Sequence, residues 1–125
     1  MTEVERNLAI FEDHQRSIDS MQRLLEMSGY SVVGLATTMQ EAQALIDQLK
    51  DLGVKVALVD GNLVEGDYSN YDGQQIIEQI QEKAPGVRTI GQPSRGSIPG
   101  ANFNVSKGES PRSLINALEA IFSSK

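Results

Sequence analysis

The chain contains no cysteine and no tryptophan, and His14 is its only histidine. Without thiols the protein can form no disulfide bond, no thiolate metal site and no cysteine nucleophile. We expect His14 to lie exposed at the start of the first helix, without a catalytic or ligand role.

Basic residues are in the minority, with 11 Lys and Arg against 17 Asp and Glu and a net charge of -6. They form no cluster along the chain, so the electrostatic footprint of a nucleic-acid-binding protein is missing and we expect no direct contact with nucleic acid. No apolar run is long enough to span a membrane, and residues 1–6 do not open a signal peptide. We therefore expect a cytoplasmic protein that makes no membrane contact.

The composition is that of an ordinary globular protein. Hydrophobic residues make up 39% and charged residues 22% of the 125 positions, which is neither disordered nor membrane-like. A chain of this length is long enough to bury a core, and it shows no internal repeat or linker. We expect a single domain over residues 1–125.

Three short apolar runs each end in charged residues. They are residues 7–11, followed by Glu12 and Asp13; residues 55–59, followed by Asp60; and residues 101–106, followed by Lys107. In an open parallel sheet all strands finish at the same edge, so residues far apart in sequence meet in one crevice, where such folds bind ligands. The sequence therefore predicts one site that contains all four charged side chains.

The predicted site holds more negative than positive charge. Carboxylates a few ångströms apart raise each other's pKa unless a cation joins them. Glu12, Asp13 and Asp60 together therefore predict a hard divalent cation, with Lys107 as a second counter-charge. Magnesium suits a site of oxygen ligands and keeps several of its waters there.

Strand-like and helix-like periods alternate along the chain. Strand-like segments are residues 7–11, 31–36, 54–59, 87–90 and 101–106, and helical spacing of apolar residues separates most of them. The first helix is predicted to end at Gly29, and Thr38 with Glu41 is typical of a capping box. Ser110 and Pro111 are predicted to open the last helix. Residues 92–100 hold prolines and glycines without apolar periodicity, so no helix is expected there.

This alternation predicts a doubly wound α/β domain with a five-stranded parallel sheet. Right-handed crossovers leave few topologies, of which the flavodoxin-like strand order 2-1-3-4-5 is the simplest. In that order the first and third strands are neighbours, which places Glu12 and Asp13 beside Asp60. The fourth helix is expected to be shortened or replaced by a loop.

Four motifs carry a family resemblance. They are LAIFEDH at residues 8–14, VALVD at residues 56–60, Asp72-Gly73 at an expected helix start, and the segment from Gly100-Ala101 to Lys107. Together they resemble the receiver domain of response regulators in two-component signalling systems, over nearly the whole chain. The first motif and residues 29–34 look most like receivers that precede helix-turn-helix DNA-binding domains. We expect no such output domain here, and hence an atypical, single-domain form.

The resemblance implies a role for each charged residue. Asp60 would accept a phosphoryl group from a histidine kinase or a histidine phosphotransfer protein. Asp13 would bind Mg²⁺ directly and Glu12 through water, with Asp60 and the backbone carbonyl of Asn62 completing the ligands. Lys107 would pair with Asp60 at rest and with the phosphoryl group afterwards. Magnesium-dependent self-phosphorylation and dephosphorylation of Asp60 would be the only reactions, so the protein would not otherwise be an enzyme.

The sequence also departs from the family pattern. Receivers carry a Thr or Ser at the end of the fourth strand, but counting along this chain puts Pro93 there, with Ser94 as the nearest switch candidate. The segment from Ser94 to Lys107 is too short for the usual fourth helix, and the segment from Asp60 to Gly73 is longer than usual. Gly108 replaces the proline that normally follows the lysine, so a cis peptide bond is not expected there.

Two classes of function remain open. Retention of the charged residues favours a phosphoacceptor that signals through protein contact, and loss of the switch elements favours a pseudo-receiver, a phosphate-independent interaction module. A metal-dependent phosphatase ranks third, because Asn62 stands where a second acid would be needed. The downstream protein partner and the formation of a homodimer are left open by the sequence.

Overall fold

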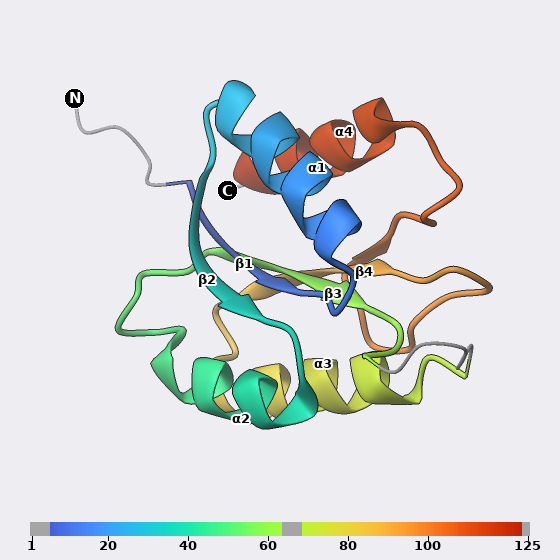
Figure 1. Ribbon diagram of the computed structural model, residues 1–125. Helices are drawn as coiled ribbons and strands as arrows, with labels where there is room; N and C mark the ends of the chain where they lie inside the picture. The colour runs from blue at the N-terminus through green and yellow to red at the C-terminus, as the bar shows by residue number, and fades with distance from the viewer. Residues whose placement is uncertain (1–5, 64–68, 124–125) are drawn as a thin grey trace.

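Five parallel strands form a single sheet in the order β2-β1-β3-β4-β5 (Figure 1). This computed structural model describes residues 6–63 and 69–123. The strands are β1 (Asn7–Phe11), β2 (Ser31–Ala36), β3 (Val56–Asp60), β4 (Arg88–Gln92) and β5 (Phe103–Asn104). The helices are α1 (Gln15–Met27), α2 (Met39–Gln48), α3 (Tyr71–Lys83) and α4 (Pro111–Ser123). The predicted fold class and strand order are confirmed.

Helices α1 and α4 cover one face of the sheet, and α2 and α3 cover the other (Figure 1). Successive strand residues alternate between the two faces, so Ile10 and Leu58 pack toward α1 and α4. Phe11 and Val59 pack toward α2 and α3. Strand β3 is buried at every position, as expected of a central strand covered on both faces. In this alternation Asp60, the residue after Val59, falls on the α1 and α4 face.

The predicted helix boundaries have the expected capping contacts. Gly29 follows α1 with φ +91, and its N–H donates to the carbonyl of Glu26 at 3.2 Å. At the start of α2, the N–H of Glu41 donates to the hydroxyl of Thr38 at 3.1 Å. The Glu41 carboxylate in turn accepts the N–H of Thr37, one residue before the cap, at 2.8 Å. These side chains satisfy backbone donors that the first helical turn leaves unpaired.

The fifth strand is much shorter than predicted. Residues 101–106 were expected to form it, but only Phe103–Asn104 has strand geometry. The parallel hydrogen-bond pattern nevertheless continues past the strand, because the Val105 N–H donates to the Gly91 carbonyl at 2.8 Å and the Lys107 N–H donates to the Pro93 carbonyl at 3.0 Å. This pairing holds Lys107 at the edge of the sheet where the other strands end.

Residues 93–102 form a loop, and the expected absence of a helix between β4 and β5 is confirmed. Ile98 in this loop is only 1% exposed and packs among the core residues under α2 and α3. The loop therefore covers core that a helix would otherwise cover. The long segment between Asp60 and Gly73 is described except for residues 64–68, which lie outside the described part of the chain.

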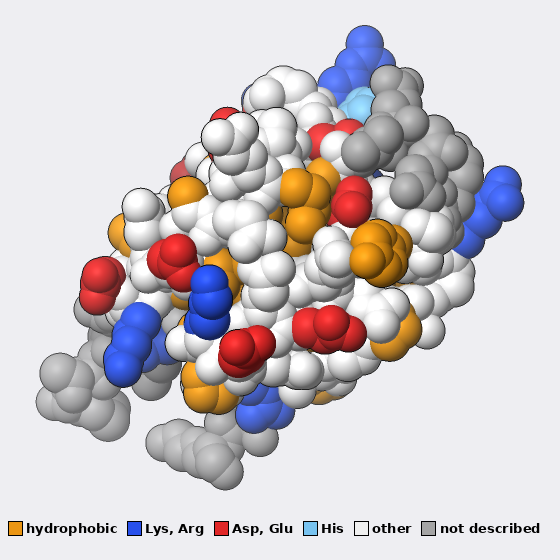
Figure 2. Space-filling view, turned by 90° about the horizontal axis from the view of Figure 1, so that it is seen from below, with side chains coloured by type: hydrophobic (Ala, Val, Ile, Leu, Met, Phe, Trp, Pro, Cys, Tyr) orange, Lys and Arg blue, Asp and Glu red, His pale blue; other side chains and the backbone are white. Residues whose placement is uncertain are grey.

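The surface over α2 and α3 carries acidic and basic side chains interspersed with one another (Figure 2). Among the helices in the described ranges, none has both the length and the apolar character needed to cross a bilayer. No peptide bond between described residues is cis, in line with the expectation for Gly108.

Candidate functional site

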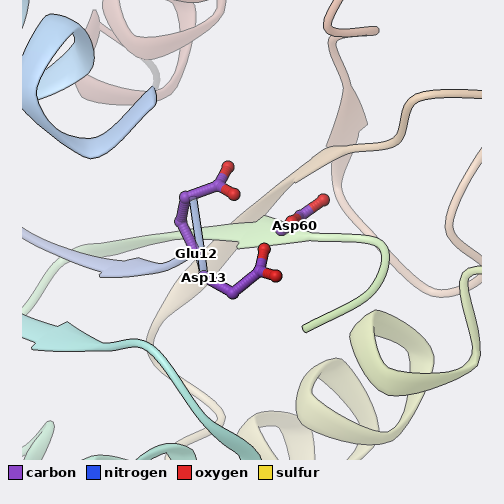
Figure 3. Close-up of side chains that lie close together, drawn as sticks. All are labelled: Glu12, Asp13 and Asp60. Atoms are coloured by element: carbon purple, nitrogen blue, oxygen red, sulfur yellow. The ribbon is translucent and has the colours of Figure 1, made fainter. Parts of the chain in front are cut away.

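The carboxyl ends of β1 and β3 bring three acids together. Glu12 and Asp13 follow β1, and Asp60 is the last residue of β3 rather than the first residue after it. One carboxylate oxygen of each lies within 4.8 Å of those of the other two, and the side chains converge above the strand ends (Figure 3). Glu12 and Asp60 are buried, whereas Asp13 is half-buried and therefore partly exposed to solvent.

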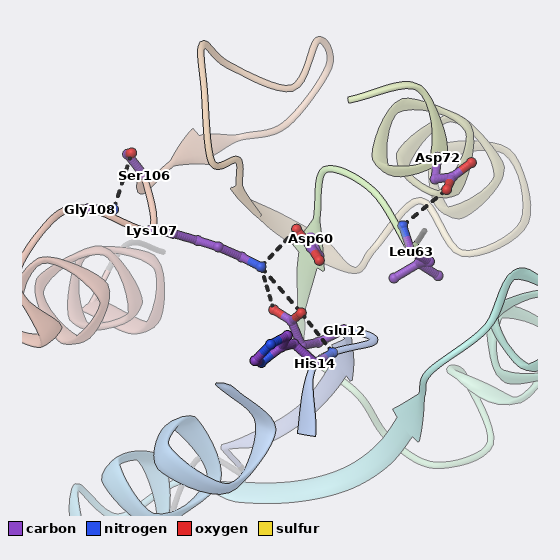
Figure 4. Close-up of polar contacts among 8 residues, drawn as sticks. All are labelled: Glu12, His14, Asp60, Leu63, Asp72, Ser106, Lys107 and Gly108. Carbon is purple, nitrogen blue, oxygen red and sulfur yellow. Dashed lines mark hydrogen bonds and ion pairs between the residues drawn. The ribbon is translucent and has the colours of Figure 1, made fainter. Parts of the chain in front are cut away.

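Lys107 reaches this cluster from the far edge of the sheet. Its Nζ lies 3.1 Å from Glu12 Oε1 and 3.1 Å from Asp60 Oδ1 (Figure 4). Glu12 Oε2 also accepts the backbone N–H of His14 at 3.2 Å, which fixes the carboxylate at the start of α1. His14 itself is exposed, as expected from the sequence. The structure therefore brings the four predicted charged residues into one site.

The electrostatics of the site show an excess of negative charge. Burial, together with the neighbouring carboxylate of Glu12, raises the pKa of Asp60 to about 7, although the ammonium of Lys107 opposes this shift. Partial burial lowers the pKa of Lys107, but the charges of Glu12 and Asp60 outweigh that effect and leave the pKa raised. A cluster of three oxygen donors with this excess charge fits a hard divalent cation such as Mg²⁺.

Two glycines allow α3 to begin directly against the end of β3. The N–H of Gly73 donates to the carbonyl of Gly61 at 2.7 Å, and a Cβ on Gly73 would stand only 2.6 Å from the carbonyl oxygen of Asp60. The carboxylate of Asp72 accepts the N–H of Leu63 at 3.0 Å and so shapes the backbone that follows Asp60 (Figure 4). The predicted role of Asp72 and Gly73 at the start of a helix is confirmed, since α3 begins at Tyr71.

Asn62, proposed above as a carbonyl ligand, lies two residues after Asp60 and is 8% exposed. Its side-chain Oδ1 accepts the hydroxyl of Ser69 at 3.3 Å. This contact ties the backbone after β3 to the residues that precede α3. The side chain of Asn62 is thus used for local structure, and the metal-binding role of its backbone carbonyl stays a prediction.

Strand β4 ends at Gln92, level with the end of β3. The register pairs Asp60 with Gln92, so Gln92, not Pro93, is the strand residue level with Asp60. Pro93 follows the strand and has no N–H to donate to a neighbouring strand, although its carbonyl still accepts the Lys107 N–H. Ser94 is exposed and lies beyond the strand end. The assignment of Ser94 as the switch candidate stays a prediction.

Gln92 was missed as a site residue. Together with Glu12 and Lys107 it lines a cavity of about 310 Å³ between α1 and α4. Side chains paired across neighbouring parallel strands point to the same face of the sheet, so Gln92 and Asp60 share the face toward α1 and α4. An amide side chain therefore lies level with Asp60 at the end of β4.

Solved structures similar to this chain include response regulator receivers. The chain is 24% identical to a CheY-like receiver domain protein from Methanospirillum hungatei, with a TM-score of 0.77 and 96% of each chain covered. It is 19% identical to a response regulator from Thermotoga maritima, with a TM-score of 0.75 and coverage of 97% of this chain and 100% of that one. For the isolated receiver domain of RcsB from Salmonella enterica, studied with the phosphomimetic BeF3-, the identity is 24%, the TM-score 0.79 and the coverage 98% and 91%.

No family model matches the sequence, and no curated protein matches it closely enough to count. The structural likeness covers nearly the whole chain and shows that it has the fold of response regulator receiver domains. The sequence-based resemblance to receivers is thus confirmed at the level of the fold.

Proposed function

We propose that this chain is a single receiver domain that accepts a phosphoryl group on Asp60 from a histidine kinase or a histidine phosphotransfer protein, in two-component phosphorelay signalling. The observation that carries the proposal is the position of Asp60, at the carboxyl edge of a receiver-like sheet, beside Glu12, Asp13 and Lys107. Three expectations from the sequence stay predictions. They are a cytoplasmic location, output through a protein partner, and the absence of contact with nucleic acid.

In the proposed reaction an oxygen of the Asp60 carboxylate forms a bond to phosphorus while the bond from phosphorus to the donor histidine breaks. The departing imidazole keeps the electron pair of that bond. Lys107 Nζ, at 3.1 Å from Asp60 Oδ1, orients the nucleophile and lies beside the oxygens that the phosphoryl group would bring. The amide of Gln92, on the same face of the sheet, offers a further donor to those oxygens.

A divalent cation completes this proposal. The residues that would hold Mg²⁺ are Asp13 and Asp60 through their carboxylates, Glu12 through water, and Asn62 through its backbone carbonyl. When bound, the ion would neutralise charge on the transferred oxygens. Its fit to the site rests on the three converging carboxylates. Among the described residues, Lys107 supplies the one ammonium in an ion pair with this cluster.

The test is incubation with Mg²⁺ and acetyl phosphate, followed by intact-mass measurement of the wild type and of Asp60→Asn. We expect one added phosphoryl group on the wild type, none on the variant, and none on the wild type in EDTA. Asp47→Asn is the matched control, because Asp47 is an exposed carboxylate on α2, paired with Lys83, and should leave the adduct unchanged. Absence of an Asp60-dependent adduct would refute phosphoacceptance.

The pseudo-receiver remains the second candidate, and one observation favours it. Neither Gln92 at the end of β4 nor the exposed Ser94 places a hydroxyl level with Asp60. A module of this kind would bind its partner equally well as wild type and as Asp60→Asn, with or without phosphodonor. Partner binding that depends on the phosphodonor and on Asp60 would exclude the pseudo-receiver.

A further inference from the structure

The loop of residues 93–102 is held in place by three side-chain amides, one from β5, one from α3 and one from the residue that precedes α3. Asn104 in β5 accepts the N–H of Ile98 at 2.8 Å. Gln81 in α3 donates to the carbonyl of Gly100 at 2.8 Å. Asn70, at the start of α3, donates to the carbonyl of Arg95 at 2.8 Å. The loop lies at the same edge of the molecule as the start of α3 (Figure 1).

Asn70 is the unusual member of this set. It has φ 63 and ψ 18, and within the described ranges it is the only residue other than glycine with a positive φ. Asparagine tolerates this left-handed conformation better than most side chains do. Asn70 is only 8% exposed, and its amide nitrogen makes a second, longer contact of 3.4 Å with the carbonyl of Ser97. The amide nitrogen of this buried side chain thus contacts two loop carbonyls, from a residue whose backbone is left-handed.

The oxygen of the same amide packs against Gly61, the residue after Asp60. The Oδ1 of Asn70 occupies the space that a Cβ on Gly61 would need. Gly61 is bonded directly to Asp60, and its carbonyl accepts the N–H of Gly73 in the first turn of α3. One side chain therefore touches the backbone next to the proposed phosphoacceptor and also the loop carbonyls, with no other residue between them.

The loop has a second connection to the site at its own start. The carbonyl of Pro93 accepts the backbone N–H of Lys107 at 3.0 Å, and the Lys107 ammonium contacts Asp60 and Glu12. The stretch of residues 93–97 is therefore connected to the site at both of its ends, through Lys107 at Pro93 and through Asn70 at Arg95 and Ser97. Ser94 and Ser97 in that stretch are exposed, so a change there is open to a partner.

We propose that Asn70 is a positioning residue that couples the acid cluster to the loop of residues 93–102, so that occupancy of the cluster changes the hydrogen bonding of the loop. The inference rests on the proposed function, because occupancy here means Mg²⁺ with a phosphoryl group or its analogue. The coupling is mechanical. A shift of the Asp60 to Gly61 backbone moves Asn70 Oδ1, and the amide nitrogen of the same rigid group moves against the Arg95 carbonyl.

The test measures amide hydrogen exchange in residues 93–102 with and without Mg²⁺ and beryllofluoride. In the wild type we expect exchange in this segment to change by about threefold or more on ligand addition, as for a local opening of modest free energy. Asn70→Gly keeps the left-handed backbone accessible but removes both amide contacts, and it should abolish the response. Asn70→Asp keeps an oxygen toward Gly61 and removes the amide donors, so it should also abolish it.

Gln81→Ala is the matched control, because it removes a loop contact of the same length that does not reach the acid cluster. It should speed exchange near Gly100 and keep the response to ligand. Occupancy is measured separately as the rise in melting temperature with Mg²⁺ and beryllofluoride. No occupancy in the wild type would overturn the proposed function and the coupling with it. Occupancy without a change in loop exchange, or an equal response in Asn70→Gly, would overturn the coupling alone.

Discussion

Asp60→Asn is expected to stabilise the metal-free protein, and the gain is expected to grow with pH. Burial and the Glu12 carboxylate raise the pKa of Asp60 from 3.8 to about 7. Between these values the folded state holds a proton that the unfolded state has released, so the free energy of unfolding falls as pH rises through this window. The amide introduced by Asp60→Asn does not ionise and escapes this loss.

The magnitude follows from the size of the shift. A difference of roughly three pKa units corresponds to about 4 kcal/mol between the two protonation states. Glu12 shares the repulsion with Asp60, and the pocket can relax. We therefore expect Asp60→Asn to raise the free energy of unfolding at pH 8 by about half of this amount, near 2 kcal/mol. At pH 5 the folded-state carboxyl is still protonated, and the expected gain is below about 1 kcal/mol.

The assay is urea unfolding followed by circular dichroism, in EDTA, at pH 5 and at pH 8. The control is Asp47→Asn, an exposed member of a surface ion pair, which should change the free energy of unfolding by less than about 1 kcal/mol at either pH. An equal gain for Asp60→Asn at both pH values, or no gain at pH 8, would refute the argument that ionisation of this carboxyl destabilises the fold.

Three further predictions concern the neighbours of Asp60. Lys107→Met removes the ammonium at 3.1 Å from Asp60 and should lower the free energy of unfolding at pH 8 by roughly 1–3 kcal/mol, measured in urea; unchanged stability would contradict the ion pair. Asp13→Asn should weaken Mg²⁺ binding by about tenfold or more in titration calorimetry, and unchanged affinity would remove Asp13 from the ligands. Gly73→Ala places a Cβ at 2.6 Å from the Asp60 carbonyl and should cost at least about 1 kcal/mol, whereas Gly86→Ala, with nothing within 4 Å, should be tolerated; equal effects would contradict the close approach.

The sequence by itself determined the fold class, the strand order and the convergence of the charged residues. Periods of two and of 3.6 residues separate strands from helices, and parallel strands must end at one edge of their sheet. Glu12, Asp60 and Lys107 could therefore be placed together from their positions after apolar runs, and the contacts near 3.1 Å agree with that placement. The end of the first helix at Gly29 was also local information.

Only the tertiary structure decided the register and the contacts between loops. The pairing of Asp60 with Gln92 depends on how far β4 slides along β3, which no local pattern fixes to a single residue. The role of Asn70 arises because its amide lies between Gly61 and the Arg95 carbonyl, 25 residues away in sequence. Such contacts form only when two loops meet in the folded protein. They escape prediction because neither loop has a periodic pattern of apolar residues that would fix its structure from the sequence.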